Sequence, residues 1–244
     1  MPTQQTIRFT SDGYQLVGDL HLPDKNRCPV VIGCHGLLAN RQSPKQIALA
    51  EALNRMSIAY LRFDHRGCGE SQGAWNSRTL LTDRCRDLYH AIQAMQSHSA
   101  IGGLAGLFGS SFGGTIVMAV AADHPVPRLV TYASPITSRT VHQQAAADQI
   151  QAHNALSTNE LEALAFDIRP QLPLLKNILV LHSENDEIVP CDHARQIFAA
   201  ARDPKKLIIF SGGDHRLSDP DCQAQFIEAC TAWFRSGNSA KKAS

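Results

Sequence analysis

One stretch of the sequence has the residue types and spacing of a serine nucleophile. Gly109, Ser111 and Gly113 stand in a Gly-x-Ser-x-Gly arrangement, with Ser110 and Phe112 at the variable positions. A serine hydroxyl attacks a carbonyl only when a base removes its proton, and that base needs a third group to hold its reactive tautomer. The motif arises by chance in about one chain in ten of this length, so its surroundings decide its meaning.

Those surroundings are a strand and a helix, which hydrophobic patterning predicts over about 104–108 and 113–122. This is the context that the motif requires. Gly109 and Gly113 permit a sharp strand-to-helix turn in which larger side chains would collide with the backbone. We therefore expect Ser111 to occupy such a turn, with Ser110 as the adjacent hydroxyl behind it.

Candidates for the base and the acid follow two later apolar runs. The run at 178–181 leads into His182 and a loop of carboxylates, and the run at 207–210 leads into His215. We favour His215 over His182 as the base because its loop follows the last predicted strand. Sequence position alone does not decide which carboxylate is the acid. The candidates are Glu184, Asp186, Glu187 and Asp214, although Asp214 is too close in sequence to His215 to face it easily.

The rest of the chain alternates between strand and helix patterns. Two short runs around Asp12-Gly13 predict an antiparallel hairpin. Short apolar runs then alternate with helical stretches, which predicts a mostly parallel sheet with helices on both faces. The remaining expected strands lie at about 30–33, 58–63, 104–108, 129–132, 178–181 and 207–210, and the expected helices at about 44–55, 79–97, 113–122, 192–200 and 224–234.

The alternation breaks once, between about 138 and 172. This stretch carries helical signals, including the capping box Ser157-x-x-Glu160, but no strand pattern. We expect a short helical, cap-like insertion over one end of the sheet, within a single domain that spans 1–244. Its polar and Ala-rich composition does not indicate a particular ligand.

The overall composition argues against several other functions. The 23 basic and 22 acidic residues nearly balance, which leaves no electrostatic footprint for nucleic acid and no polybasic membrane patch. No apolar run approaches the roughly 20 residues of a spanning helix, and the first residues lack the features of a signal peptide. None of the 7 cysteines forms a Cys-x-x-Cys pair, so neither a zinc site nor a disulfide framework is indicated. We expect a cytoplasmic protein with no metal, nucleic-acid or membrane partner.

Four blocks, taken in order, resemble the α/β-hydrolases over nearly the whole chain. They are Cys34-His35-Gly36-Leu37, the segment 64–71, the Gly-x-Ser-x-Gly block, and the loops of Asp186 and His215. Together they are specific, although each alone is not. The chain most resembles small bacterial carboxylesterases and cinnamoyl/feruloyl esterases, and more distantly serine aminopeptidases and acyl-transferring thioesterases. It departs from dienelactone hydrolases, which have cysteine where Ser111 stands.

The resemblance implies an α/β-hydrolase fold with a Ser-His-Asp triad. Ser111 would be the nucleophile and His215 the general base. Asp186 would be the acid, because Asp186, Val189 and Pro190 match the family's Asp-x-x-Val-Pro pattern.

The resemblance also implies an oxyanion hole formed by the backbone N–H groups of Leu37 and Phe112. The His35-Gly36 turn would direct the Leu37 amide toward the nucleophile, and the Leu37 side chain would enter the acyl pocket. We expect His35 to be a structural hydrogen-bonding residue. A Cys34–His35 catalytic pair is disfavoured, because neighbouring side chains usually point apart.

The expected reaction is hydrolysis of a small-molecule carboxylic ester through an acyl-enzyme, without a metal or organic cofactor. Thioester hydrolysis and peptide cleavage on the same triad are alternatives, because substrate preference depends on the pocket rather than on the fold. A non-catalytic relative that binds a ligand is less favoured, since such proteins usually lose a triad member. No oligomeric state follows from the sequence.

Overall fold

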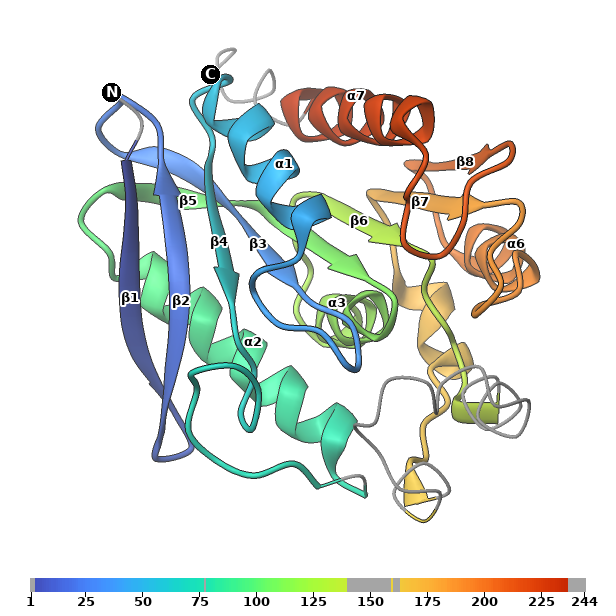
Figure 1. Ribbon diagram of the computed structural model, residues 1–244, viewed down its shortest axis with the longest axis horizontal. Coiled ribbons are helices and arrows are strands. Elements are labelled where there is room, and N and C mark those ends of the chain that lie inside the picture. The colour runs from blue at the N-terminus through green and yellow to red at the C-terminus, as the bar shows by residue number, and fades with distance from the viewer. Residues whose placement is uncertain (1–2, 77, 140–158, 160–162, 237–244) are drawn as a thin grey trace.

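One sheet organises the fold (Figure 1). The computed structural model describes residues 3–76, 78–139, 159 and 163–236. Within them the sheet has 8 strands in the order β1-β2-β4-β3-β5-β6-β7-β8. The strands are β1 (Thr3–Ser11), β2 (Tyr14–Leu22), β3 (Cys28–Cys34), β4 (Ala59–Phe63), β5 (Ile101–Ser110), β6 (Leu129–Tyr132), β7 (Ile178–Ser183) and β8 (Lys205–Phe210).

The expected hairpin opens the chain. β1 and β2 pair antiparallel in a register that places Ser11 opposite Tyr14. In the turn between them, φ is 46° at Asp12 and 85° at Gly13. Positive φ at both residues gives a two-residue turn whose twist matches that of the flanking strands. β2 also pairs antiparallel with β4, and every later pair in the sheet is parallel. The prediction of a mostly parallel sheet with an N-terminal hairpin is confirmed.

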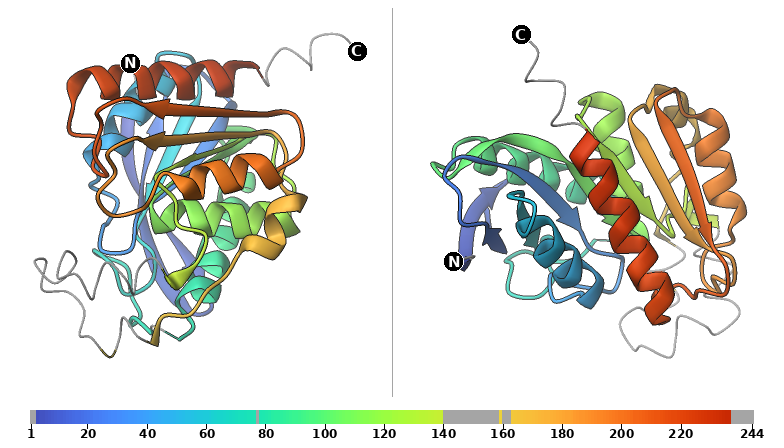
Figure 2. Two further views of the ribbon diagram at one scale, coloured as in Figure 1. Left: turned by 90° about the vertical axis from the view of Figure 1, so that its right-hand side faces the viewer. Right: turned by 90° about the horizontal axis from the view of Figure 1, so that it is seen from above.

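Helices cover both faces of the sheet, as predicted (Figures 1 and 2). One face carries α1 (Pro44–Asn54) and α7 (Pro220–Ser236), and the other carries α2 (Leu80–Gln96), α3 (Phe112–Asp123) and α6 (Asp192–Ala200). A separate apolar cluster fills the space on each side. Among the helices in the described ranges, none has the length and apolar character of a membrane span.

α7 begins earlier than hydrophobic patterning predicts. The apolar pattern starts at about 224, whereas the helix starts at Pro220. Asp219 explains the difference, because its Oδ1 accepts a hydrogen bond from the Cys222 backbone N–H at 2.8 Å. An aspartate cap followed by proline at the first helical position is a favourable start for a helix. Because the first turn of α7 contains few apolar residues, hydrophobic patterning does not detect it.

Most of the expected cap-like insertion, including its capping box, lies outside the described residues. The described residues on its two sides meet, because Thr137 and Asp167 form an isolated antiparallel bridge. The Ser138 N–H also donates to the Phe166 carbonyl at 2.9 Å. A short 3-10 helix, η2 (Arg169–Leu174), then leads toward β7. The segment that follows β6 and the segment that leads to β7 are therefore neighbours in the structure.

The parallel strands bring several loops to one edge of the sheet. β3, β5, β7 and β8 run parallel, so their carboxyl ends lie on the same side. The loops that follow these four strands carry Leu37, Ser111, Asp186 and His215, respectively. In open α/β sheets this edge is where ligands bind.

Candidate active site

Ser111 lies in a strained turn between β5 and α3. Its backbone has φ 56° and ψ −130°, a region that residues other than glycine rarely adopt. The Ser111 N–H donates to the Tyr132 carbonyl at 2.8 Å, and the Ser111 carbonyl accepts from the Gly114 N–H at 2.8 Å. These two bonds hold the turn so that the side chain leaves the end of the strand.

The two motif glycines allow this turn to pack against its neighbours. A Cβ on Gly109 would lie 2.3 Å from the Gly113 carbonyl oxygen, and a Cβ on Gly113 would lie 2.3 Å from the Cys34 carbonyl oxygen. Both distances are shorter than any real carbon–oxygen contact. The spacing of the motif therefore follows from how closely α3 approaches β3 and β5.

The structure brings Ser111, His215 and Asp186 together. Ser111 Oγ lies 3.2 Å from His215 Nε2. On the other side of the ring, His215 Nδ1 lies 2.9 Å from Asp186 Oδ1 and 3.0 Å from Oδ2. The carboxylate can therefore hold the proton on Nδ1 and leave Nε2 free to accept the serine proton.

Asp186 is held as a carboxylate by its surroundings. Its Oδ1 accepts backbone hydrogen bonds from Ile188 at 2.9 Å and Val189 at 2.8 Å. Burial opposes ionisation, but the hydrogen bonds from His182 and His215 outweigh it and keep the pKa of Asp186 well below its ordinary value. His182, the alternative base, is fully buried behind this carboxylate, with Nε2 3.3 Å from Asp186 Oδ2 and 2.8 Å from the Val189 carbonyl oxygen.

The other candidate acids have different partners. Asp214 Oδ1 accepts from the Ser218 N–H at 2.7 Å, and Glu184 Oε2 accepts from Ser211 Oγ at 3.3 Å. Glu187 Oε2 accepts from the His215 backbone N–H at 3.0 Å rather than from the ring. In the described part of the chain, Asp186 alone among these carboxylates contacts the His215 imidazole.

The residues expected to form the oxyanion hole, Leu37 and Phe112, lie beside Ser111. Among the described residues, neither N–H donates a hydrogen bond to the protein. Phe112 follows Ser111 directly at the start of α3. The turn before Leu37 is close to the serine, since a Cβ on Gly36 would lie 3.3 Å from Ser111 Cβ and 3.7 Å from its Oγ.

His35 stabilises that turn through both ring nitrogens. Nε2 accepts from the His65 N–H at 3.2 Å, so Nδ1 carries the proton and donates to the Gly36 carbonyl at 2.8 Å. Burial, followed by the nearby His65 and Arg84, keeps the pKa of His35 well below its ordinary value. Burial also raises the pKa of Cys34 well above the usual thiol value, which argues against a Cys34–His35 nucleophile pair.

Lys45 is a neighbour of the triad that sequence patterns did not reveal. Its Nζ donates to Ser110 Oγ at 3.2 Å and to the His215 carbonyl at 3.4 Å, and it lies 4.2 Å from the centroid of the Tyr132 ring. Burial lowers the pKa of Lys45 to about 8, against the opposing charges of Asp186 and Asp214. Lys45 thus connects the turn of the nucleophile to the loop of His215.

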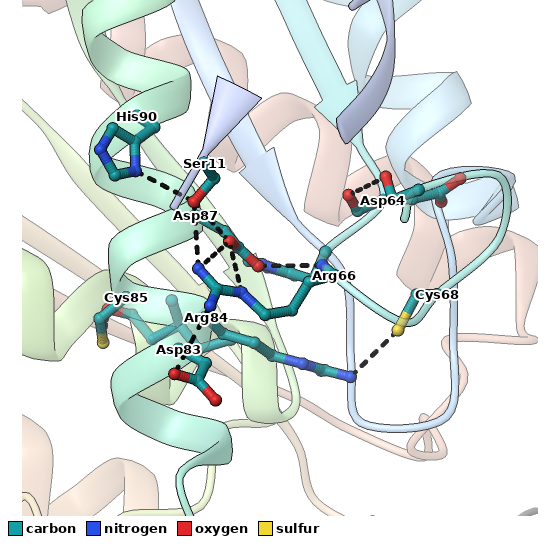
Figure 3. Close-up of polar contacts among 12 residues, drawn as sticks. Ser11, Asp64, Arg66, Cys68, Asp83, Arg84, Cys85, Asp87 and His90 are labelled. Atoms are coloured by element: carbon teal, nitrogen blue, oxygen red, sulfur yellow. Dashed lines mark hydrogen bonds and ion pairs between the residues drawn. The ribbon is translucent and has the colours of Figure 1, made fainter. Parts of the chain in front are cut away.

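A buried polar network lies beneath the site on α2 (Figure 3). Arg66 donates through Nη2 to Asp87 Oδ1 at 2.7 Å, and its backbone N–H donates to Asp87 Oδ2 at 2.9 Å. This anchors the loop after β4 to the helix. Arg84, from the same helix, donates to the carbonyls of Gly36 and Leu37 at 3.3 and 3.1 Å.

A cavity of about 1360 Å³ opens at the triad. It runs from Ser111 and His215 between α1 and α7, and apolar side chains such as Leu37, Leu217 and Ile227 form much of its wall. A pocket of this size and character accommodates a small organic molecule. Among the described residues, no cluster of three or more histidine, cysteine or acidic side chains is arranged to hold a metal ion.

Comparisons with known proteins agree with this architecture. The family model described as the alpha/beta hydrolase fold matches residues 29–173. YfhR of Escherichia coli strain K12 is 26% identical over 219 residues, which cover 86% of this chain and 73% of YfhR.

Two solved structures are similar over 96% of this chain. The esterase domain of a Rhodothermus marinus protein is 26% identical, with a TM-score of 0.72 over 98% of its own chain. Est1E from Butyrivibrio proteoclasticus, solved with ferulic acid, is 19% identical, with a TM-score of 0.79 over 99% of its chain. The family model, the sheet order and the strand-to-helix turn at Ser111 lead to one conclusion: this chain belongs to the α/β-hydrolase fold family.

Proposed function

We propose that this protein is a serine hydrolase that cleaves carboxylic esters through an acyl-enzyme intermediate. The observation that supports the proposal most strongly is the continuous contact from Asp186 through His215 to Ser111. An ionised carboxylate, an imidazole and a serine hydroxyl in this order form a nucleophile activated by a base whose tautomer is fixed.

In the proposed mechanism, Ser111 Oγ attacks the ester carbonyl while His215 Nε2 takes its proton. The carbonyl oxygen becomes an oxyanion, which accepts hydrogen bonds from the N–H groups of Leu37 and Phe112. Neither group has an acceptor among the residues that the structure describes. His215 then gives the proton to the leaving alcohol oxygen, and the acyl group stays on Ser111. Water, deprotonated by His215, then attacks the acyl-enzyme carbonyl. The acyl–Oγ bond breaks, His215 returns the proton to Ser111 Oγ, and the acid is released.

An ester is the favoured substrate class for two reasons. The cavity at Ser111 is largely apolar, which suits an acyl or alcohol group of moderate size. The Rhodothermus marinus protein, similar over nearly the whole chain, is described as an esterase domain. Thioester and amide hydrolysis use the same groups, so they are the alternatives that the experiment must separate.

The test is a substrate panel run on the wild-type protein and on Ser111→Ala. The panel contains p-nitrophenyl esters of several chain lengths, a hydroxycinnamate methyl ester, an acyl-CoA and an aminoacyl-anilide. We expect ester turnover by the wild type and a loss of about 10³-fold or more in Ser111→Ala. Ser110→Ala, which removes the adjacent hydroxyl, is the matched control and should retain turnover.

Selective hydrolysis of the acyl-CoA or the anilide would assign the triad to thioesters or peptides instead. Equal activity in the wild type and Ser111→Ala would contradict the proposed nucleophile.

A further inference from the structure

We propose that Arg84 is a positioning residue for the oxyanion hole, which orients and polarises the peptide group between Gly36 and Leu37. The inference rests on the proposed function, because it concerns the amide assigned there to the oxyanion. No sequence motif includes Arg84, and its side chain does not line the cavity at Ser111.

The location of Arg84 is unusual for a charged residue. The side chain is fully buried, and within the described residues no carboxylate lies at ion-pair distance from it. Its Nε has no hydrogen-bond partner there. The thiols beside it, Cys34 and Cys68, have pKa values raised by burial, so they do not supply a compensating thiolate.

Burial of an unpaired guanidinium costs stability. Desolvation lowers the pKa of Arg84, and the nearby Asp87 carboxylate opposes this shift only in part. Replacing buried charges with apolar groups of similar size is often neutral or stabilising. Arg84 is therefore poorly explained as an element that stabilises the core.

The contacts of Arg84 point to the oxyanion turn. Nη1 donates to the Gly36 carbonyl at 3.3 Å, and Nη2 donates to the Leu37 carbonyl at 3.1 Å and to Cys68 Sγ at 3.3 Å. Figure 3 shows the side chain extending from α2 to Cys68. The guanidinium carbon also lies 5.5 Å from the centroid of the Phe112 ring. Arg84 thus contacts both residues whose amides are proposed to bind the oxyanion.

The geometry of a peptide bond explains how these contacts act. The Gly36 carbonyl and the Leu37 N–H belong to the same planar group, and in a trans peptide they point in opposite directions. Arg84 and His35 both donate to the Gly36 oxygen, at 3.3 and 2.8 Å. Fixing that oxygen toward the interior fixes the N–H in the opposite direction. Donors on the carbonyl, one of them cationic, also strengthen the N–H as a donor.

The decisive variant is Arg84→Met, which keeps an unbranched side chain and removes the charge and the donors. We expect kcat for a short p-nitrophenyl ester to fall about 10- to 100-fold, with KM within about twofold of the wild type. The Ki of a trifluoromethyl ketone, which forms an oxyanion on the serine, should rise by a similar factor. The melting temperature should stay equal or increase.

Arg62→Met is the matched control. Arg62 is also buried, but it forms an ion pair with Asp19 at 3.1 Å and contacts no residue of the proposed site. Its loss should lower the melting temperature and leave kcat and the ketone Ki near the wild-type values. Opposite effects of the two substitutions would separate positioning of the oxyanion hole from support of the core.

Arg84→Lys and Arg84→Gln keep the test decisive if Arg84→Met does not fold. We expect kcat to decrease in the order wild type, Lys, Gln, because lysine keeps the charge. A Met or Gln variant with wild-type kcat and ketone affinity would overturn the proposal, as would a loss confined to KM. The proposed function is judged separately by the difference between the wild type and Ser111→Ala.

Discussion

Nε2 of His215 lies 3.2 Å from Oγ of Ser111, although the two residues are 104 positions apart in the sequence. The sheet order explains the approach, because β5, β6, β7 and β8 lie side by side and run in the same direction. The loops after β5 and β8 therefore leave the same edge. The loop after β7 lies between them and places Asp186 against the histidine.

Asp186→Asn should leave the fold intact and lower kcat by about 10⁴-fold, because the amide no longer holds His215 in its reactive tautomer. The matched control is Asp214→Asn. The Asp214 side chain accepts from the Ser218 N–H, and an asparagine oxygen can do the same. Steady-state kinetics and circular dichroism of both variants make the comparison. A severe loss in Asp214→Asn with normal activity in Asp186→Asn would show that the acid is misassigned.

Lys45→Met should change how stability depends on pH. Burial lowers the pKa of Lys45 to about 8 in the folded protein, against an ordinary value of 10.5. Between these values the unfolded chain binds more protons than the folded chain, so the contribution of Lys45 to stability increases as pH rises through this window. The wild type should therefore gain stability relative to Lys45→Met from about pH 8 to about pH 10.5, as measured by urea denaturation.

Lys206→Met, which removes an exposed lysine, is the control for that experiment. If the difference between the wild type and Lys45→Met were constant across the window, burial would not be the dominant influence on Lys45.

Leu37→Ala should alter acyl preference more than it lowers the maximal rate. The proposed oxyanion donor is the backbone N–H, which the substitution keeps, whereas the side chain forms part of the cavity wall. We expect the ratio of kcat/KM values for long and short p-nitrophenyl esters to change. An inactive but folded Leu37→Ala variant would reveal a role of the side chain that the present mechanism lacks.

The sheet and the positions of the candidate triad could be predicted because they depend on local patterns. Apolar runs identify the parallel strands, and in a parallel sheet the loops after them meet at one edge. This reasoning predicted that Ser111, Asp186 and His215 lie at that edge, and in the structure their side chains are within hydrogen-bond distance of one another. It could not choose among neighbouring carboxylates from position alone, since that choice depends on which side chain faces the imidazole.

Arg84 and Lys45 were missed because their contacts depend on packing between distant elements. Arg84 does carry a signal in the sequence, since it stands between Leu80 and Leu88 on the buried face of α2. A charged residue within an apolar helical stripe indicates a buried polar contact but does not name its partner. Lys45 lies in the first turn of α1, where a lysine has no such distinctive pattern.

The most direct test of the proposed mechanism is to identify the residue modified by a fluorophosphonate probe, using peptide mass spectrometry. The probe reacts with an activated serine and leaves a stable adduct on its oxygen. We predict one adduct, on Ser111 and not on the adjacent Ser110, and no adduct in Ser111→Ala or after heat denaturation. Labelling that persists in Ser111→Ala, or complete loss of ester hydrolysis while Ser111 stays unmodified by the probe, would contradict the account.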